Sequence, residues 1–278
     1  MKMKKVADLL IEKKIAFDKK EAESLIMAGK IYINDEPIKK PGQLLPDSSD
    51  IKVKNIKEYV SRGAIKLKKA VDDFGILLIG KIAIDIGAST GGFTDFMLRN
   101  KIKKVIAVDV NYGQFDWQLR NNPDVVLFER TNIKKLLKKD LPEIPNLAVA
   151  DLSFISLKNV FGNIFDIISD EGEILLLVKP QFEAKREMFG KKGIILDKEA
   201  HEIILKELTK YIIDNFPIEF KGISFSPIKG AKGNIEFWLY VKKIVKNNSQ
   251  KKDFNYDRIF QMIETIVNQA HEYFLRRI

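Results

Sequence analysis

The sequence contains no cysteine and only two histidines, His201 and His271. Without cysteine the chain can form neither disulfide bonds nor thiolate metal sites, and two histidines disfavour a histidine-based metal centre. Long apolar runs are also missing: the longest strong one, Ile174–Val178, is far shorter than the ~20 residues of a membrane-spanning helix. The basic N-terminus lacks the apolar core of a signal peptide. We therefore expect a soluble, cytoplasmic protein that binds no metal and no membrane.

Positive charge is in excess. The 278 residues include 48 Lys and Arg against 38 Asp and Glu, so the formal net charge is +10 and the pI is about 9.4. This balance favours polyanionic partners such as nucleic acid. A compositional explanation competes with that one, because Lys, Ile and Asn are abundant together, as an AT-rich genome would produce. The length of the chain predicts two domains.

The first fifty or so residues have the pattern of a small α+β domain. Apolar residues at helical spacing predict two short helices, the second of which ends at Gly29. Ile31–Ile33, a turn at Asn34–Asp35 and Ile38 predict a hairpin, and Ile51–Val53 predicts a further strand.

This segment is rich in lysine and resembles the S4 domain of RNA-binding proteins. The likeness lies in Ala22–Asn34. Lys5 and Lys19 stand where that family usually has Arg, and lysine lacks the bidentate hydrogen bonding of an arginine side chain. The lysines expected to contact RNA are Lys4, Lys5, Lys13, Lys14, Lys19, Lys20 and Lys30. The alternative is a small domain with a solvated, lysine-rich face.

From residue 82 onward, short apolar strands alternate with helical patterns. This alternation predicts an α/β fold, a doubly wound Rossmann-like sheet. The strands are expected at 82–86, 104–109, 125–128, 146–151 and 173–178, and the helices at 91–99, 114–121, 133–138, 158–168 and 198–215. Two further strands, 218–225 and 235–241, are expected to pair antiparallel at a sheet edge, and 254–278 predicts an amphipathic helix. We divide the chain into domains at 1–58 and 59–246, with a C-terminal helical extension at 247–278.

A glycine-rich loop follows the first strand of this sheet. In doubly wound folds ligands lie beyond the carboxyl ends of the strands, at this first loop. The spacing is neither that of a dinucleotide-binding dehydrogenase nor that of a P-loop. The residues predicted to bind a cofactor here are Asp85, Gly87, Ala88, Ser89, Thr90, Gly91, Gly92 and Phe93.

A carboxylate ends the next strand as well. Asp109 stands where an acidic side chain can accept hydrogen bonds from both ribose hydroxyls of a nucleoside, and Asn132 stands where an amide can meet the adenine edge. The combination predicts S-adenosyl-L-methionine as the cofactor. Val110, Gln114 and Asp151 complete the predicted cofactor site.

Two polar residues follow the fourth and fifth strands. Asp151 ends one and Lys179 ends the other, so both are expected at the cofactor side of the sheet. Lys179 follows an apolar run, where burial can lower the pKa of a lysine.

The order of these motifs resembles the haemolysin A (TlyA) family, whose methyltransferase domain is of the FtsJ type. The motifs are Tyr59-Val-Ser-Arg-Gly-Ala-Ile-Lys66, the glycine-rich loop, Val108-Asp-Val-Asn-Tyr-Gly-Gln114, Glu129-Arg-Thr-Asn132, Asp151-Leu-Ser-Phe154, Lys179-Pro-Gln-Phe-Glu183 and Gly233-Asn-Ile-Glu236. The resemblance covers the chain to about residue 243, with Ala64 and Asn111 in place of frequent glycines. It implies 2′-O-methylation of ribosomal RNA, typically at cytidine, and implies the catalytic residues Lys66, Asp151, Lys179 and Glu236.

For such a reaction the protein must align the ribose oxygen with the methyl group and remove one proton. We expect Lys179 to accept that proton, Asp151 and Glu236 to orient the reacting groups, and Lys66 to stabilise the oxyanion. Carboxylates near a lysine raise its pKa, and the sequence leaves open whether desolvation outweighs them.

Basic residues after Lys179 offer a possible grip on phosphates, although a solvated loop explains them equally well. They are Lys185, Arg186, Lys191 and Lys192, whereas Lys134, Lys135, Lys138 and Lys139 fit a solvated helix face. The partner is expected to be ribosomal RNA or a ribosomal subunit. Two alternatives are a membrane-active haemolysin that uses residues 254–278, and an RNA-binding protein with an inactive methyltransferase domain. The sequence does not indicate the oligomeric state, the target nucleotide or the subunit.

Overall fold

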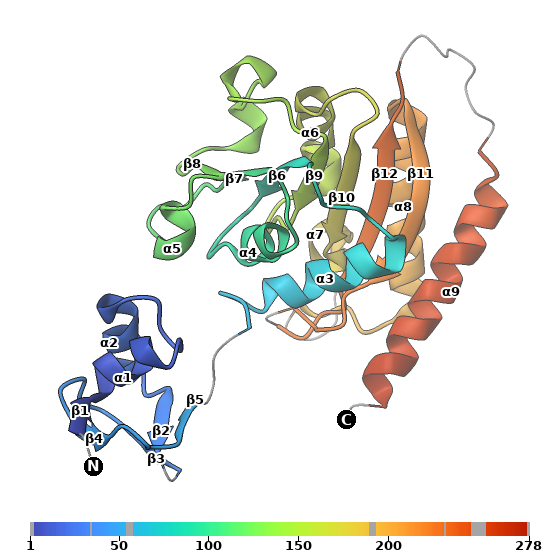
Figure 1. Ribbon diagram of the computed structural model, residues 1–278. Helices are drawn as coiled ribbons and strands as arrows, with labels where there is room; N and C mark the ends of the chain where they lie inside the picture. The colour runs from blue at the N-terminus through green and yellow to red at the C-terminus, as the bar shows by residue number, and fades with distance from the viewer. Residues whose placement is uncertain are drawn as a thin grey trace. The chain divides into compact units, whose positions relative to one another are not determined.

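The computed structural model describes residues 3–33, 35–53, 58–188, 193–230, 232–245 and 254–276. The chain divides into two compact units, residues 1–58 and 59–278 (Figure 1). Each unit has its own buried apolar cluster.

The first unit combines two helices with short strands. Helices α1 (Val6–Glu12) and α2 (Lys19–Met27) pack together, and Asp18 caps α2 by accepting a hydrogen bond from the Glu21 amide. Strands β2 (Ile31–Ile33), β3 (Glu36–Pro37) and β5 (Ile51–Val53) form one antiparallel sheet, as the apolar pattern predicts. A second ladder pairs β1 (Met3–Lys5) with β4 (Leu44–Pro46); the sequence pattern did not predict it. The core comprises Val6, Ala7, Leu10, Ala16, Ala22, Ile26, Ile31 and Ile38.

The second unit is built on a seven-stranded sheet in the order β11-β12-β10-β9-β6-β7-β8. The five parallel strands are β6 (Ile82–Ile86), β7 (Lys104–Val108), β8 (Val125–Phe128), β9 (Leu147–Ala150) and β10 (Glu173–Val178). Strands β11 (Ile218–Phe225) and β12 (Phe237–Lys243) pair antiparallel, and β12 pairs antiparallel with β10. The predicted α/β sheet and its antiparallel edge pair are therefore confirmed.

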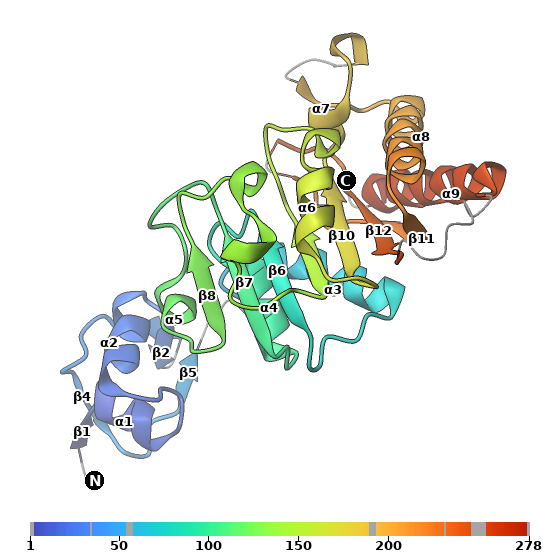
Figure 2. The same cartoon turned by 90° about the horizontal axis from the view of Figure 1, so that it is seen from above.

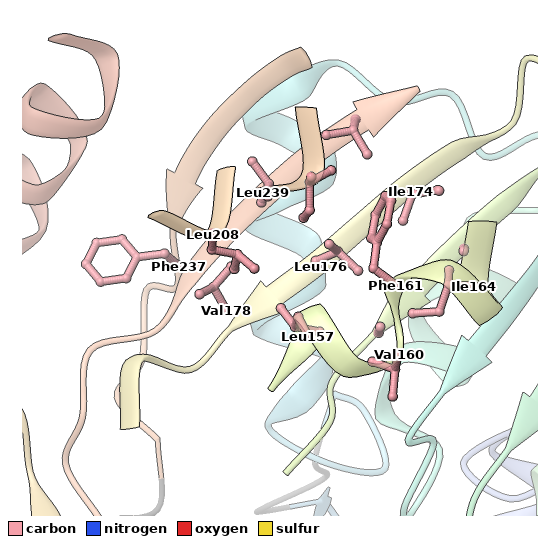
Figure 3. Close-up of a cluster of buried hydrophobic side chains, with 14 of the residues drawn as sticks. Leu157, Val160, Phe161, Ile164, Ile174, Leu176, Val178, Leu208, Phe237 and Leu239 are labelled. Atoms are coloured by element: carbon pink, nitrogen blue, oxygen red, sulfur yellow. The ribbon is translucent and has the colours of Figure 1, made fainter. Parts of the chain in front are cut away.

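Helices cover both faces of this sheet, because its central strands are apolar on both sides (Figure 2). Alternate residues of β10 face opposite layers: Leu175 and Leu177 contact the cluster of α3 (Gly63–Phe74) and α4 (Gly92–Arg99). Ile174, Leu176 and Val178 face the layer of α6 (Phe161–Ile167) and α8 (Lys198–Asn215), as Figure 3 shows.

Two short helices and several 3₁₀ turns complete this unit. They are α5 (Trp117–Arg120), α7 (Pro180–Glu183), η1 (Ile133–Lys135), η2 (Lys138–Asp140), η3 (Leu157–Asn159) and η4 (Arg186–Met188). The predicted helix at 133–138 was wrong in type, because Asn132 caps a single turn and the chain leaves helical geometry at Leu136. The predicted helix at 114–121 is shorter, since Asp116 caps it only from Trp117 onward.

The C-terminal helix α9 (Tyr256–Leu275) packs on its own unit. Its apolar stripe, Ile259, Ile263, Val267, Ala270 and Phe274, is buried in the same cluster as α6 and α8. His201 of α8 and His271 of α9 lie 2.9 Å apart, Nδ1 to Nε2. In the part of the chain described above, no helix combines the length and apolarity needed to cross a membrane.

Candidate active site

Two positions of the loop after β6 can hold only glycine. Gly87 has φ +85°, and a Cβ there would lie 2.5 Å from the carbonyl oxygen of Asp151. Gly91 has φ +92°, and a Cβ there would lie 2.5 Å from Leu119 Cδ1. Positive φ and these close approaches both require glycine. The backbone of the loop therefore lies in close contact with the start of the segment that follows β9.

Asp109 connects this loop to the one after β7. Its Oδ2 accepts a hydrogen bond from the Ser89 amide and its Oδ1 accepts one from the Asn111 amide, each at 2.7 Å. A carboxylate oxygen can accept a second hydrogen bond, so Asp109 keeps the capacity to receive ribose hydroxyls. Its position at the end of β7 is the predicted one.

The other residues predicted for the nucleoside end differ in how they are engaged. The side-chain oxygen of Asn132 accepts a hydrogen bond from the Lys134 amide, which leaves its NH₂ group for a ligand. Val110 and Gln114 are exposed beyond the end of β7. Val110, Gln114 and Asn132 are not among the residues that line the cavity at this end of the sheet.

A cavity of about 290 Å³ lies at this end of the sheet. That volume lies just below the usual range for small-molecule sites, roughly 300–1,000 Å³. Its walls include Lys66 and Asp151 together with Gly87, Ala88, Ser89, Thr90, Gly92 and Phe93 of the glycine-rich loop. The sequence pattern did not single out Ile228, Lys229 and Gly230, which line it from the β11–β12 connection. The sequence feature that could have pointed to them is the pair Lys229–Gly230 between the two predicted strands.

The four residues implied by the resemblance lie in one chain of ion pairs. Lys66 Nζ lies 2.7 Å from Glu236 Oε2 and 3.6 Å from Asp151 Oδ2. Lys179 Nζ lies 2.5 Å from Asp151 Oδ1 and donates a hydrogen bond of 2.8 Å to Ser153 Oγ. Two lysines and two carboxylates from four segments thus alternate in space.

Local structure delivers each of these side chains to the same edge. Asp151 and Lys179 directly follow the neighbouring parallel strands β9 and β10, and Glu236 directly precedes the antiparallel strand β12. Lys66 comes from the first turns of α3, which packs on the sheet through Ala64 and Leu67. Glu236 is buried at this edge.

Burial and charge shape the acidity of this cluster. Burial lowers the pKa of Lys66, but the ion pairs with Asp151 and Glu236 outweigh it, so the pKa is raised. Burial raises the pKa of Glu236, although Lys66 opposes the shift. Lys66 therefore stays charged at neutral pH.

Asp85 lies buried at the end of β6. Its Oδ2 accepts a hydrogen bond from Thr94 Oγ1 at 2.7 Å, and its Oδ1 has no hydrogen-bond partner among the described residues. Burial raises the pKa of Asp85 to about 7, and the Thr94 hydrogen bond opposes that shift. Asp85 is fully buried and is not among the residues that line the cavity, so its carboxyl group supports the loop from beneath. Asp109, whose oxygens keep free lone pairs, fits the ribose of the cofactor, and Asp151 places a carboxylate in the cavity wall.

The predicted basic flap is only partly described. Lys185 and Arg186 are exposed, and Lys191 and Lys192 lie outside the described residues. Lys134, Lys135, Lys138 and Lys139 are exposed along the two 3₁₀ turns η1 and η2. Among the described residues, no group of three or more His, Asp or Glu side chains is arranged to hold a metal ion.

A Rossmann-like sheet of this order, with a glycine loop after its first strand and a carboxylate at the end of its second, has the features expected of an S-adenosylmethionine-dependent methyltransferase. Comparison with known proteins agrees. The chain belongs to the FtsJ-like methyltransferase family, whose model matches residues 59–243.

Its relatives extend beyond that domain. YqxC of Bacillus subtilis, provisionally named an rRNA methyltransferase, is 43% identical over 84% of this chain and 83% of its own length. The 16S/23S rRNA (cytidine-2′-O)-methyltransferase TlyA of Mycobacterium tuberculosis is 37% identical over 84% of this chain and 87% of its own. A solved structure from Streptococcus thermophilus, provisionally named a hemolysin, covers 100% of this chain and 98% of its own at 38% identity and a TM-score of 0.74. The resemblance to the TlyA and haemolysin A proteins is confirmed.

Proposed function

We propose that this protein transfers the methyl group of S-adenosyl-L-methionine to a ribose 2′-hydroxyl of ribosomal RNA, with cytidine as the target nucleoside. The observation that carries the proposal is the chain of ion pairs Lys179–Asp151–Lys66–Glu236 beside the cofactor cavity. The substrate follows from the relatives, because the TlyA protein of M. tuberculosis is named for cytidine-2′-O methylation of 16S and 23S rRNA.

The bound cofactor supplies an electrophilic methyl group, so the protein needs to position the ribose oxygen and remove one proton. Lys66 contacts two carboxylates and stays charged, so it is suited to stabilise the developing oxyanion. Among the described residues, Lys179 forms an ion pair with one carboxylate, Asp151, and we assign the proton of the 2′-hydroxyl to its Nζ. That assignment requires Lys179 to be neutral when the RNA is bound.

Asp151 lies between the two lysines and orients both of them. Glu236 contacts Lys66 but not Lys179 within ion-pair distance, so its role is to hold Lys66 in place. The four residues would then act as one unit, in which the loss of any member impairs the others.

We further propose that residues 1–58 form an S4-like RNA-binding domain. Lys5, Lys13, Lys14 and Lys19 are exposed on α1, α2 and their flanks, where they can attract phosphates. Lys4 is less available, because it forms an ion pair with Glu12. Asn34, at the end of the S4-like segment, lies outside the described residues. Action on ribosomal RNA or an assembled subunit would place the protein in the cytoplasm.

The two alternatives are less well supported. A membrane-active haemolysin needed the apolar face of residues 254–278, and that face is buried against α8 and β11. An inactive domain is disfavoured because all four implied catalytic residues are joined by ion pairs in one continuous series.

Tritiated S-adenosylmethionine, incubated with purified protein and separate 30S and 50S subunits from a strain lacking the enzyme, tests the proposal. Label in wild-type reactions, and none with Lys179→Ala, is expected. A Lys139→Ala variant serves as the control, since that lysine is exposed and belongs to none of the ion pairs of this cluster. Cofactor binding without label on either subunit or naked rRNA would point to another substrate, and no cofactor binding would overturn the enzyme assignment.

A further inference from the structure

Glu183 is a partly buried residue that does not belong to the chain of ion pairs. Its carboxylate bridges the segments that follow β9 and β10. It belongs to α7, the short helix directly after Lys179. Its Oε2 accepts a hydrogen bond of 2.6 Å from Ser156 Oγ, and its Oε1 accepts one of 2.7 Å from the Leu157 amide. Both oxygens are therefore engaged by the segment that follows Asp151.

The same two segments are joined at two further points. Lys179 contacts Asp151 and Ser153, and the ring of Phe182 lies 5.2 Å from that of Phe154, centroid to centroid. Residues 151–157 are thus attached to residues 179–183 at three successive positions. Glu183 provides the last of them and the only one made by a charged group on a backbone amide.

The attached segment has an unusual shape. Phe154 has φ +63°, in the left-handed region, and its side chain is 85% exposed. A non-glycine residue persists in that region only when its surroundings hold it there, because the conformation is strained. The anchors on either side of Phe154, Ser153 and Ser156, are the contacts that can impose it.

We propose that Glu183 is a positioning residue for RNA methylation: it holds residues 151–157 so that Asp151 meets the two lysines and Phe154 offers its ring to the RNA. An exposed aromatic ring is suited to stack on a nucleobase. Glu183 touches neither the cofactor cavity lining nor the lysines, so it acts through this segment. The inference rests on the proposed function.

The test compares Glu183→Ala with Glu183→Gln. Glutamine can accept from the Leu157 amide and donate to Ser156 Oγ, so it preserves the geometry without the charge. With RNA as the varied substrate, Glu183→Ala is expected to lower kcat/KM by about tenfold or more, in line with two lost hydrogen bonds. Glu183→Gln should stay within about threefold of wild type, and both variants should bind S-adenosylmethionine as wild type does.

Hydrogen exchange gives a readout that needs no activity. The Leu157 amide and its neighbours should exchange faster in Glu183→Ala than in wild type, with Glu183→Gln restoring protection. If Glu183→Ala does not fold, Ser156→Ala removes one of the two bonds and should produce a smaller loss of kcat/KM.

Wild-type kcat/KM in Glu183→Ala, or a loss of cofactor affinity that parallels the loss of activity, would overturn the inference. Failure of the proposed function is distinct, because wild-type protein would then methylate no ribosomal RNA at all. In that case faster Leu157 exchange would still follow from the hydrogen bond but would have no bearing on catalysis.

Discussion

The ammonium group of Lys66 lies 2.7 Å from the carboxylate of Glu236, and both side chains are largely buried. One comes from the start of α3 and the other from the residue before β12, which are distant in sequence. A buried pair of this kind is costly to break on one side only, because an unpaired charge is left behind.

Lys66→Met should therefore destabilise the protein by about 3–5 kcal/mol, because Glu236 loses its partner and Asp151 loses one of two. Lys66→Met/Glu236→Met should be less destabilised than the sum of the single variants, since Asp151 keeps Lys179 as its partner. Urea unfolding measures all three. Strict additivity would mean that the two charges do not depend on each other. Both single variants should be inactive even where folded.

Gly87→Ala should lose cofactor affinity by about tenfold or more, because the new Cβ would lie 2.5 Å from the Asp151 carbonyl and the loop must move. Gly80→Ala is the matched control: Gly80 also has positive φ (+76°), but a Cβ there meets nothing within 4 Å. The control should lose only about 1 kcal/mol of stability and no affinity. Calorimetric titration with S-adenosylmethionine decides, and equal affinities for the two variants would remove the role assigned to this close approach.

The buried imidazole of His201 should make the protein less stable in mild acid. Burial, together with the smaller effect of the neighbouring His271, lowers the pKa of His201 to about 4. The unfolded chain takes up a proton near pH 6.5 while the folded one does not, so stability falls as the pH falls from 6.5 towards 4. The loss amounts to about 3 kcal/mol. His271 shifts in the same direction and adds to it.

Urea unfolding of wild type and His201→Gln between pH 7.5 and 4.5 measures this effect. The variant lacks the titrating ring and should lose less stability over that range. Asp197, Lys198, Glu202 and Lys229 also face the histidine pair, and their contribution is common to both proteins. Parallel curves for the two proteins would refute the assignment to His201.

Asp85 changes the stability of the protein with pH in the direction opposite to His201. Burial raises its pKa to about 7, so the folded state holds a proton that the unfolded chain releases near pH 4. Stability is therefore lost as the pH rises through this window, by up to roughly 4 kcal/mol. Asp85→Asn retains the acceptor for Thr94 and carries no charge.

The variant should accordingly gain stability relative to wild type at pH 8 but not at pH 4.5, as measured by urea unfolding at each pH. A gain of equal size at both values would show that ionisation of Asp85 is not the cause.

Much of the site follows from the sequence because parallel strands end at one edge of a sheet. Asp85, Asp109, Asp151 and Lys179 each follow or end an apolar strand, so their convergence could be predicted from the strand pattern alone. The glycine-rich loop could also be recognised in the sequence. The spacing of its glycines fits no phosphate-binding motif, which excluded those classes of site.

Lys66 and Glu236 could not be placed in that way. A lysine on a helix and a glutamate before an antiparallel strand read as surface charges, and only the family resemblance selected them. Tertiary packing decided their position: Ala64 and Leu67 of α3 lie in one buried cluster with Trp238 of β12, which brings the two charges together. The left-handed turn at Phe154 and its anchor at Glu183 likewise depend on contacts between segments remote in sequence.

The sequence by itself therefore determined the class of fold and the carboxylates at the strand ends, because local periodicity and strand polarity govern these. The order of its motifs determined the resemblance to the methyltransferase family. Only the tertiary structure decided which charges pair, which are buried and which loops are held against each other. Those properties arise from packing between distant segments, and burial can reverse what the isolated residue type suggests, as it does for Glu236.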